Sequence, residues 1–264
     1  MPATKDRIVV KVGTSTLTHL SGRTDFREMD SLVRVIADLQ NSGYAMTLVT
    51  SGAIGIGMGK LGLAARPKDI PSKQAAATVG QCELMFIYDK MFGEYGHKVG
   101  QLLITKEDVE NSVRHQNLVS AIERLFDWGV IPIINENDAV AIEEIVYGDN
   151  DSLSAIVARL VHADKLIILT DIDGLYDSNP KSNPDARLIQ TVEKITPEIS
   201  ALARDTSSDL GTGGMITKLH AAAIASAAGI DTYVVNGRPV ENIYRVLDGQ
   251  NPGTWFKAVK TDVG

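Results

Sequence analysis

Short apolar runs rich in β-branched residues alternate along the whole chain with segments whose apolar residues recur at helical spacing. Strands that alternate with helices favour a mostly parallel sheet with helices on both faces. We therefore expect an α/β fold. The predicted strands are residues 7–12, 44–50, 99–105, 130–135, 165–170 and 232–236, and the predicted helices are residues 29–39, 71–95 (one helix or two), 117–128, 152–162, 214–228 and 240–247.

The length of 264 residues allows one large α/β domain or two small ones. The chain has no internal repeat and no low-complexity linker. We place the best candidate boundary near Asp164, between a front half and a back half that share one sheet. Residues 139–147 alternate weakly between apolar and polar, which indicates a small hairpin or edge element.

The composition excludes several classes of protein. A net charge of −7 argues against coating nucleic acid or an anionic membrane. The single cysteine, Cys82, cannot form an internal disulfide, so we expect a reducing cytoplasm and a buried thiol. The five histidines lack metal-site spacing, and the start of the chain does not have the pattern of a signal peptide. We therefore expect a cytoplasmic protein without a metal held by its own side chains.

Polar residues follow the predicted strands where the strands end. Lys11 and Gly13, Thr50–Ala53, Asn135–Asp138 and Thr170–Asp171 each come at or after such an end, and residues 148–151 open a predicted helix. The carboxyl ends of parallel strands form the ligand crevice of open α/β sheets. Since loops are polar in any case, ordinary turns remain the alternative.

Two glycine-rich stretches are candidate phosphate sites. Gly57, Gly59 and Gly62 form a GxGxxG pattern, but it begins about seven residues too late after its strand for a dinucleotide fingerprint. Residues 211–218 precede a helix instead, so backbone N–H groups and Lys218 can approach an anion; a flexible loop with a solvated lysine is the alternative. Lys11 stands within an apolar strand, which requires an anionic partner.

Six motifs carry a resemblance to a known family: VKVGTSTLT, VTSGAIGIG, INENDAV, GDNDSLSA, LTDIDGLY and GTGGMITKLHAA. In this order they resemble the glutamate 5-kinases of the amino acid kinase superfamily, from about residue 7 to about residue 256. The resemblance implies a three-layer αβα sandwich and a single domain over residues 1–264, with a glutamate-binding half at about 1–164 and an ATP-binding half at 165–264. Many members carry a C-terminal PUA domain, and we expect none here because the chain ends soon after Phe256.

The resemblance implies transfer of the γ-phosphoryl group of MgATP to the γ-carboxylate of L-glutamate, the first step of proline biosynthesis. It assigns Lys11 and Lys218 to the transferring group and Asp151 to orienting both lysines. It implies glutamate binding by Ser51, Gly52, Asn135, Asp138 and Asn150. It implies ATP binding by Lys11, Gly13, Thr170, Asp171, Thr212, Gly213, Gly214, Met215, Ile216, Thr217 and Lys218. Mg²⁺ would be held chiefly by phosphate oxygens and water.

The resemblance also implies feedback inhibition by L-proline and a homo-oligomer, a dimer or tetramer. Two alternatives remain open at this point. One is a related acyl-phosphate kinase with another acceptor, such as N-acetylglutamate. The other is a non-catalytic sensor of amino acids or nucleotides, against which the presence of both lysines argues.

Overall fold

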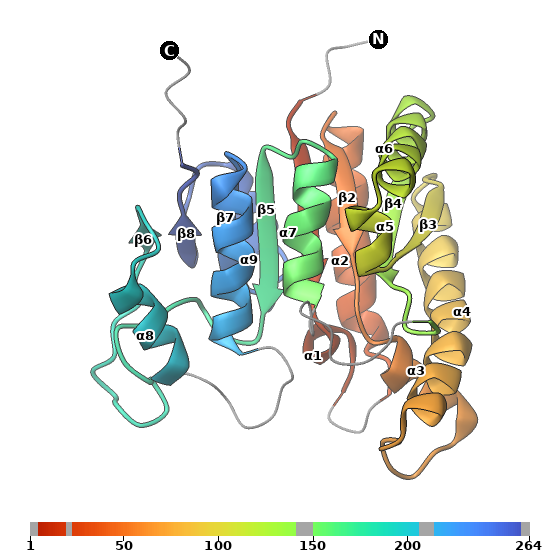
Figure 1. The fold of residues 1–264 in the computed structure, drawn as a ribbon, viewed down its shortest axis with the longest axis horizontal. Coiled ribbons are helices and arrows are strands. Elements are labelled where there is room, and N and C mark those ends of the chain that lie inside the picture. The colour runs from red at the N-terminus through yellow and green to blue at the C-terminus, as the bar shows by residue number, and fades with distance from the viewer. Residues whose placement is uncertain (1–4, 20–22, 141–149, 206–213, 260–264) are drawn as a thin grey trace. The chain divides into compact units, whose positions relative to one another are not determined.

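A computed structural model describes residues 5–19, 23–140, 150–205 and 214–259. The chain divides into two compact units, Met1–Lys5 with Val12–Val146 and Asp6–Lys11 with Tyr147–Gly264 (Figure 1). The division therefore comes before the helix α7 (Asn150–Leu160) and not near Asp164. The reason is packing: α7 contacts elements of the second unit, namely β5 (Lys165–Thr170) and α9 (Met215–Ala227).

The first unit is built on three parallel strands, hydrogen-bonded in the order β3-β4-β2. All of β2 is buried, and so is all of β4 except its last residue. Strands buried along their whole length are typical of a parallel sheet that helices cover. These strands are Ala45–Val49 (β2), Val99–Ile104 (β3) and Ile131–Glu136 (β4).

Capping side chains mark the start of two of the long helices of this unit. The Asp25 side chain accepts from Glu28 N at the start of α2, and the Asp69 side chain accepts from Ser72 N at the start of α4. The helices of the unit are Thr14–Leu17 (α1), Phe26–Asn41 (α2), Ala53–Leu61 (α3), Ile70–Glu94 (α4), Lys106–Glu110 (α5) and Ser112–Asp127 (α6).

The glycine-rich stretch after β2 forms helix α3, and its glycines serve packing. A Cβ atom built on Gly57 would lie 1.9 Å from Ala76 O, and one on Gly80 would lie 1.7 Å from Ala53 O. The backbones of α3 and α4 can approach this closely only where no side chain stands between them. The GxGxxG pattern thus lies within α3 and at its C-cap, not in a turn between a strand and a helix.

The second unit contains five strands in the order β1-β5-β7-β8-β6. β5 and β7 are parallel over six residue pairs, whereas β7 and β8 are antiparallel. The predicted sheet, mostly parallel, is confirmed. The strands are Arg7–Val12 (β1, whose last residue the division assigns to the first unit), Lys165–Thr170 (β5), Thr191–Val192 (β6), Asp231–Asn236 (β7) and Thr254–Phe256 (β8).

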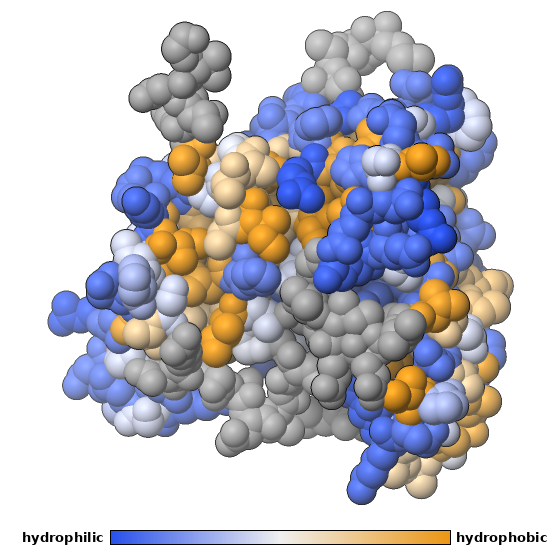
Figure 2. Space-filling model, viewed as in Figure 1, coloured by the Kyte–Doolittle hydropathy of each residue, from blue (hydrophilic) through white to orange (hydrophobic). Residues whose placement is uncertain are grey.

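Helices α7 and α9 pack against each other and against β5 and β7 of the same unit (Figure 1). On the face seen in Figure 2, hydrophobic residues gather over α9 and hydrophilic residues cover α5 and α6. In the described parts of the chain, every helix is too short or too polar to cross a membrane. The other helices of the second unit are Pro197–Asp205 (α8) and Asn242–Leu247 (α10).

Most predicted elements are found within a few residues of their expected bounds, and residues 71–95 form one helix rather than two. The prediction for Cys82 is wrong, because its side chain is exposed on α4. The expected hairpin at residues 139–147 lies mostly outside the described residues. The elements that the sequence did not predict are α1, α3, α5, α8, β6 and β8.

Candidate active site

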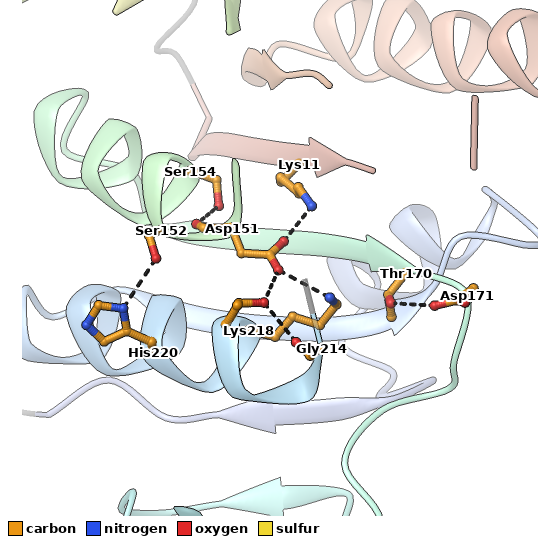
Figure 3. Close-up of polar contacts among 10 residues, drawn as sticks. Lys11, Asp151, Ser152, Ser154, Thr170, Asp171, Gly214, Lys218 and His220 are labelled. Carbon is orange, nitrogen blue, oxygen red and sulfur yellow. Dashed lines mark hydrogen bonds and ion pairs between the residues drawn. The ribbon is translucent and has the colours of Figure 1, made fainter. Parts of the chain in front are cut away.

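The second unit brings Lys11 of β1 to Asp151 at the start of α7 (Figure 3). Lys11 Nζ lies 2.5 Å from Asp151 Oδ1, and both side chains are buried. Its neighbours Val9, Val10 and Val12 in β1 are completely buried. The anionic partner that the sequence required for Lys11 is therefore Asp151.

A second lysine reaches the other oxygen of the same carboxylate. Lys218, in the first turns of α9, has its Nζ 3.2 Å from Asp151 Oδ2 and is also buried. Figure 3 shows the two ammonium groups approaching the carboxylate from different elements, Lys11 from β1 and Lys218 from α9. The three residues that the resemblance assigned to catalysis thus form one contiguous cluster.

The cluster carries two positive charges and one negative charge in the interior of the unit. Burial raises the pKa of the Asp151 carboxyl group, but the charges and hydrogen bonds of Lys11 and Lys218, with a hydrogen bond from Thr217, outweigh it and hold the pKa below its usual range. Asp151 is therefore ionised at pH 7. One positive charge is left over, which makes the cluster suited to attract an anion such as a phosphoryl group.

Thr217 also contacts Asp151, which the sequence did not predict. Its Oγ1 lies 2.8 Å from Asp151 Oδ2 and 2.8 Å from Gly214 O, and its backbone N–H donates to Gly214 O at 3.2 Å. The only signal in the sequence was its position, one residue before Lys218 in the first turn of a helix.

Gly214 is the N-cap of α9, in the segment where the sequence predicted a phosphate site and the resemblance implied ATP binding. In the first turn after it, Met215 is buried and Ile216 is 46% exposed. Free backbone N–H groups and a partial positive charge collect at such a helix start. Thr212 and Gly213 lie outside the described residues.

Thr170 and Asp171 stand at the carboxyl end of β5 (Figure 3). Thr170 Oγ1 donates to Asp171 Oδ1 at 3.2 Å, and Gly237 N donates to Thr170 O at 2.7 Å, which joins the ends of β5 and β7. The same two strand ends are joined again by Asn236, the last residue of β7, whose Nδ2 donates to Asp173 Oδ1 at 2.8 Å. These contacts order the two loops that follow the parallel strands.

Of the other predicted site residues, Asn150 is the first residue of α7 in the second unit, and the rest lie in the first unit. Gly13 is the N-cap of α1, and Ser51 and Gly52 precede α3. Gly52 adopts φ 98°, a left-handed conformation that favours glycine, and a Cβ atom added there would lie 3.6 Å from Thr14. Thr14, at the start of α1, and Gly52, at the start of α3, are thus neighbours within this unit.

Asn135, at the end of β4, has its side chain engaged within the protein. Its Nδ2 donates to Gln81 Oε1 at 2.8 Å, and its Oδ1 accepts from Glu136 N at 2.9 Å. Both Asn135 and Gln81 are buried. These hydrogen bonds make Asn135 a support for the loop that follows, whereas its predicted contact with glutamate stays a prediction.

Asp138, in the turn after β4, is half-buried and lines a cavity of about 390 Å³ together with Gln81, Glu136 and Asn137. Burial raises the pKa of the Asp138 carboxyl group, while the charge of Arg66 acts in the opposite direction. A carboxylate in this setting is stabilised by a cation. The contribution of Arg66 had no signal in the sequence.

Comparisons with known proteins cover most of the chain. The profile described as "Amino acid kinase family" matches residues 6–236. "Glutamate 5-kinase" of Clostridium tetani is 54% identical over 253 residues, which cover 96% of this chain and 95% of the relative. "Glutamate 5-kinase" of Caldanaerobacter subterraneus subsp. tengcongensis is 49% identical, over 97% of this chain and 69% of the relative.

The fold class is confirmed by a solved structure, "Carbamate kinase from Giardia lamblia bound to AMP-PNP". Its TM-score is 0.69 at 16% identity, over 97% of this chain and 99% of that one. At that identity the likeness concerns the fold alone. The chain belongs to the amino acid kinase family and, within it, to the glutamate 5-kinases.

Proposed function

We propose that this chain transfers the γ-phosphoryl group of ATP to the γ-carboxylate of L-glutamate, giving L-glutamyl 5-phosphate and ADP, the first step of proline biosynthesis. The observation that carries this function is the identity of about one half, over nearly the full length of both chains, to proteins named glutamate 5-kinase. The cluster of Lys11, Asp151 and Lys218 supplies the groups that the chemistry requires.

The γ-carboxylate of glutamate has a pKa near 4, so it is already a nucleophile at pH 7 and needs no general base. Catalysis then consists of positioning two anions and stabilising the charge on the transferring group. Lys11 and Lys218 provide this stabilisation, and Asp151 holds both ammonium groups in place while leaving a net positive charge.

Substrate contacts are proposed on the same basis. Asp138 holds the α-ammonium group of glutamate, and its half-buried position in a cavity supports this role. Ser51, Gly52, Asn150 and Asn135 are the further residues proposed for glutamate. The residues proposed for ATP are Lys11, Gly13, Thr170, Asp171 and residues 212–218.

Mg²⁺ is proposed to arrive with ATP, held by phosphate oxygens and water. Both oxygens of Asp151 already contact lysine or threonine side chains, and no group of three or more His, Cys, Asp or Glu among the described residues is placed to hold a metal. When bound, Mg²⁺ neutralises charge on the phosphates.

Three further properties are proposed from the resemblance: feedback inhibition by L-proline, assembly into a homo-oligomer and a cytoplasmic location. If proline competes with glutamate, it raises the apparent KM for glutamate and leaves that for ATP largely unchanged. Proline inhibition that excess glutamate cannot relieve would count against an overlapping site.

The function is tested with purified protein, MgATP, hydroxylamine and a panel of carboxylic acids. Hydroxylamine converts an acyl phosphate into a coloured hydroxamate. We expect colour with L-glutamate and none with N-acetylglutamate. Colour with N-acetylglutamate alone would favour the alternative acceptor, and no colour with any acid would favour the sensor.

A further inference from the structure

Thr217 has two groups that can donate a hydrogen bond, and both are engaged inside the protein. The backbone N–H donates to Gly214 O at 3.2 Å, within the first turn of α9. The hydroxyl lies 2.8 Å from Gly214 O and 2.8 Å from Asp151 Oδ2. A nucleotide phosphate, which only accepts hydrogen bonds, would have to compete with these contacts for either donor.

The hydroxyl has one proton and two oxygen neighbours, so its preferred acceptor matters. Gly214 O is a neutral carbonyl, whereas Asp151 is ionised, and a charged acceptor forms the stronger hydrogen bond. Donation to Gly214 O would leave the hydroxyl oxygen 2.8 Å from a charged oxygen, whereas donation to Asp151 leaves it 2.8 Å from a neutral carbonyl oxygen, where the repulsion is weaker. The Thr217 hydroxyl therefore donates its hydrogen bond chiefly to Asp151.

The two lysines are held unequally by the same carboxylate. Lys11 Nζ lies 2.5 Å from Oδ1, while Lys218 Nζ lies 3.2 Å from Oδ2, farther than the Thr217 hydroxyl at 2.8 Å. Oδ2 is thus already satisfied by a neutral donor. Because Lys218 is not the only donor to this oxygen, its ammonium group can turn towards another anion without leaving Oδ2 unpaired.

We propose that Thr217 is a positioning residue for phosphoryl transfer: its hydroxyl holds the Asp151 carboxylate in place and thereby releases Lys218 to the transferring phosphoryl group. This inference rests on the proposed kinase activity. For Thr217 it replaces the direct ATP contact proposed for residues 212–218, since both of its donors are engaged inside the protein and the residue acts through Asp151 and Lys218. Without the hydroxyl, Lys218 becomes the sole close partner of Oδ2 on α9 and is drawn towards Asp151.

Two substitutions separate the hydroxyl from the shape of the side chain. Thr217→Val keeps the shape and removes the donor, and Thr217→Ser keeps the donor. We expect Thr217→Val to lower kcat by about ten- to a hundredfold, with the KM values for ATP and glutamate changed less than threefold, which is the loss typical of one hydrogen bond to a charged group. Thr217→Ser should retain most of the parent kcat.

A matched control removes a hydroxyl that only bonds back within its own helix. Ser120 Oγ donates to Gln116 O at 2.8 Å on the exposed side of α6, so Ser120→Ala should leave kcat unchanged. The double variant Thr217→Val, Lys218→Ala gives a second readout. If Thr217 acts through Lys218, Thr217→Val costs little further kcat once Lys218 is gone.

The outcomes are distinct. A kcat loss restored by serine and absent in the Lys218→Ala background supports the inference. A raised KM for ATP with unchanged kcat in Thr217→Val would overturn it in favour of direct ATP binding, and a lowered Tm with parental kcat would overturn it in favour of a structural role. Failure of the parent protein to phosphorylate glutamate would instead contradict the proposed function itself.

Discussion

The ammonium group of Lys11 lies 2.5 Å from the carboxylate of Asp151, and neither side chain is exposed by more than a tenth. A buried ion pair contributes little net stability, because the desolvation of both groups offsets their attraction. Here a second buried lysine, Lys218, shares the same carboxylate, so the cluster keeps an uncompensated positive charge. Two buried lysines around one carboxylate do not serve stability. Their excess positive charge is suited to binding an anion.

Replacing Asp151 with Asn removes the anion between two buried ammonium groups. Breaking a buried pair by removing one partner typically costs about 3–5 kcal/mol, so we expect the variant to unfold at lower urea concentration and to lose nearly all activity. Equilibrium urea unfolding of parent and variant at pH 7 measures the difference.

The same pair predicts a pH dependence whose sign follows from the lowered pKa of Asp151. The unfolded chain has an Asp pKa of about 3.9, so the stabilisation is fully present above about pH 4. As the pH falls below about 4, the Asp151 carboxylate of the unfolded chain takes up a proton before that of the folded protein does. The stabilisation is lost progressively until the pH has passed through the lower folded pKa. The gap in unfolding free energy between parent and Asp151→Asn should therefore stay constant from pH 7 to about pH 5 and shrink below about pH 4. A constant gap down to pH 3 would contradict the assignment.

Lys218→Ala removes the cation that we propose stabilises the charge redistributed during phosphoryl transfer. Loss of one preorganised donor typically costs about 3–4 kcal/mol of transition-state stabilisation, or ~10²–10³ in kcat. Lys218→Arg should restore only part of this, because a planar guanidinium differs in shape from a compact ammonium group. Steady-state kinetics at saturating ATP and glutamate give the comparison, and a kcat for Lys218→Ala within a few-fold of the parent would refute the role.

Much of the fold follows from residue spacing in the sequence. The strands β2, β4 and β5 consist mostly of apolar residues, and the apolar stripe of α2 recurs every three or four residues, so their positions were predictable. Helix α3 was missed because its glycines resemble those of a loop. Gly57 allows the close approach of α4, and that contact cannot be read from the local sequence. The strands β6 and β8 are too short for periodicity to detect.

The candidate site was predicted less completely than the fold. Lys11, Asp151 and Lys218 were identified through motif resemblance, with Lys11 also marked by its place in an apolar strand. The bond from Thr217 to Asp151 and the effect of Arg66 on Asp138 arise where separate segments pack together, which no local pattern encodes. Cys82 was misplaced because α4 has no distinct polar face from which to orient it.

Asp138→Ala should act on glutamate binding and not on chemistry. An interaction with the α-ammonium group is equally strong in the ground and transition states, so its loss appears mainly in KM. Removing one partner of a desolvated charge pair costs roughly 2–5 kcal/mol, which raises the glutamate KM by about one and a half to three and a half decades. The ATP KM should change little, and Asp138→Asn should be milder.

The raised pKa of Asp138 provides an independent readout. Since the folded pKa exceeds the unfolded value of about 3.9, ionisation of this group destabilises the folded protein at pH 7. Asp138→Asn should therefore have a Tm no lower than the parent in the absence of glutamate. A lower Tm together with an unchanged glutamate KM would mean that Asp138 only stabilises its own turn.

Gly57→Ala and Gly80→Ala each place a methyl group against a backbone carbonyl of the facing helix. We expect each substitution to destabilise the protein by about 1–3 kcal/mol or more, because α3 and α4 must move apart. Gly93→Ala is the matched control, since an added Cβ in the same helix α4 meets nothing within 4 Å. That variant should be unchanged or more stable by about 1 kcal/mol. Equal Tm values for all three variants would contradict the close helix contact.

The central claim, that the glutamate γ-carboxylate attacks ATP, is tested most directly by an oxygen label. The parent protein is incubated with MgATP, hydroxylamine and L-glutamate carrying ¹⁸O in both oxygens of its γ-carboxylate, and the released inorganic phosphate is analysed by mass spectrometry. Attack by the carboxylate makes one ¹⁸O the bridging atom of the acyl phosphate, and hydroxylamine then displaces phosphate that retains it. We predict one ¹⁸O per phosphate released. Phosphate without ¹⁸O would mean that water attacks ATP instead, and would contradict the assignment of this chain as a glutamate 5-kinase.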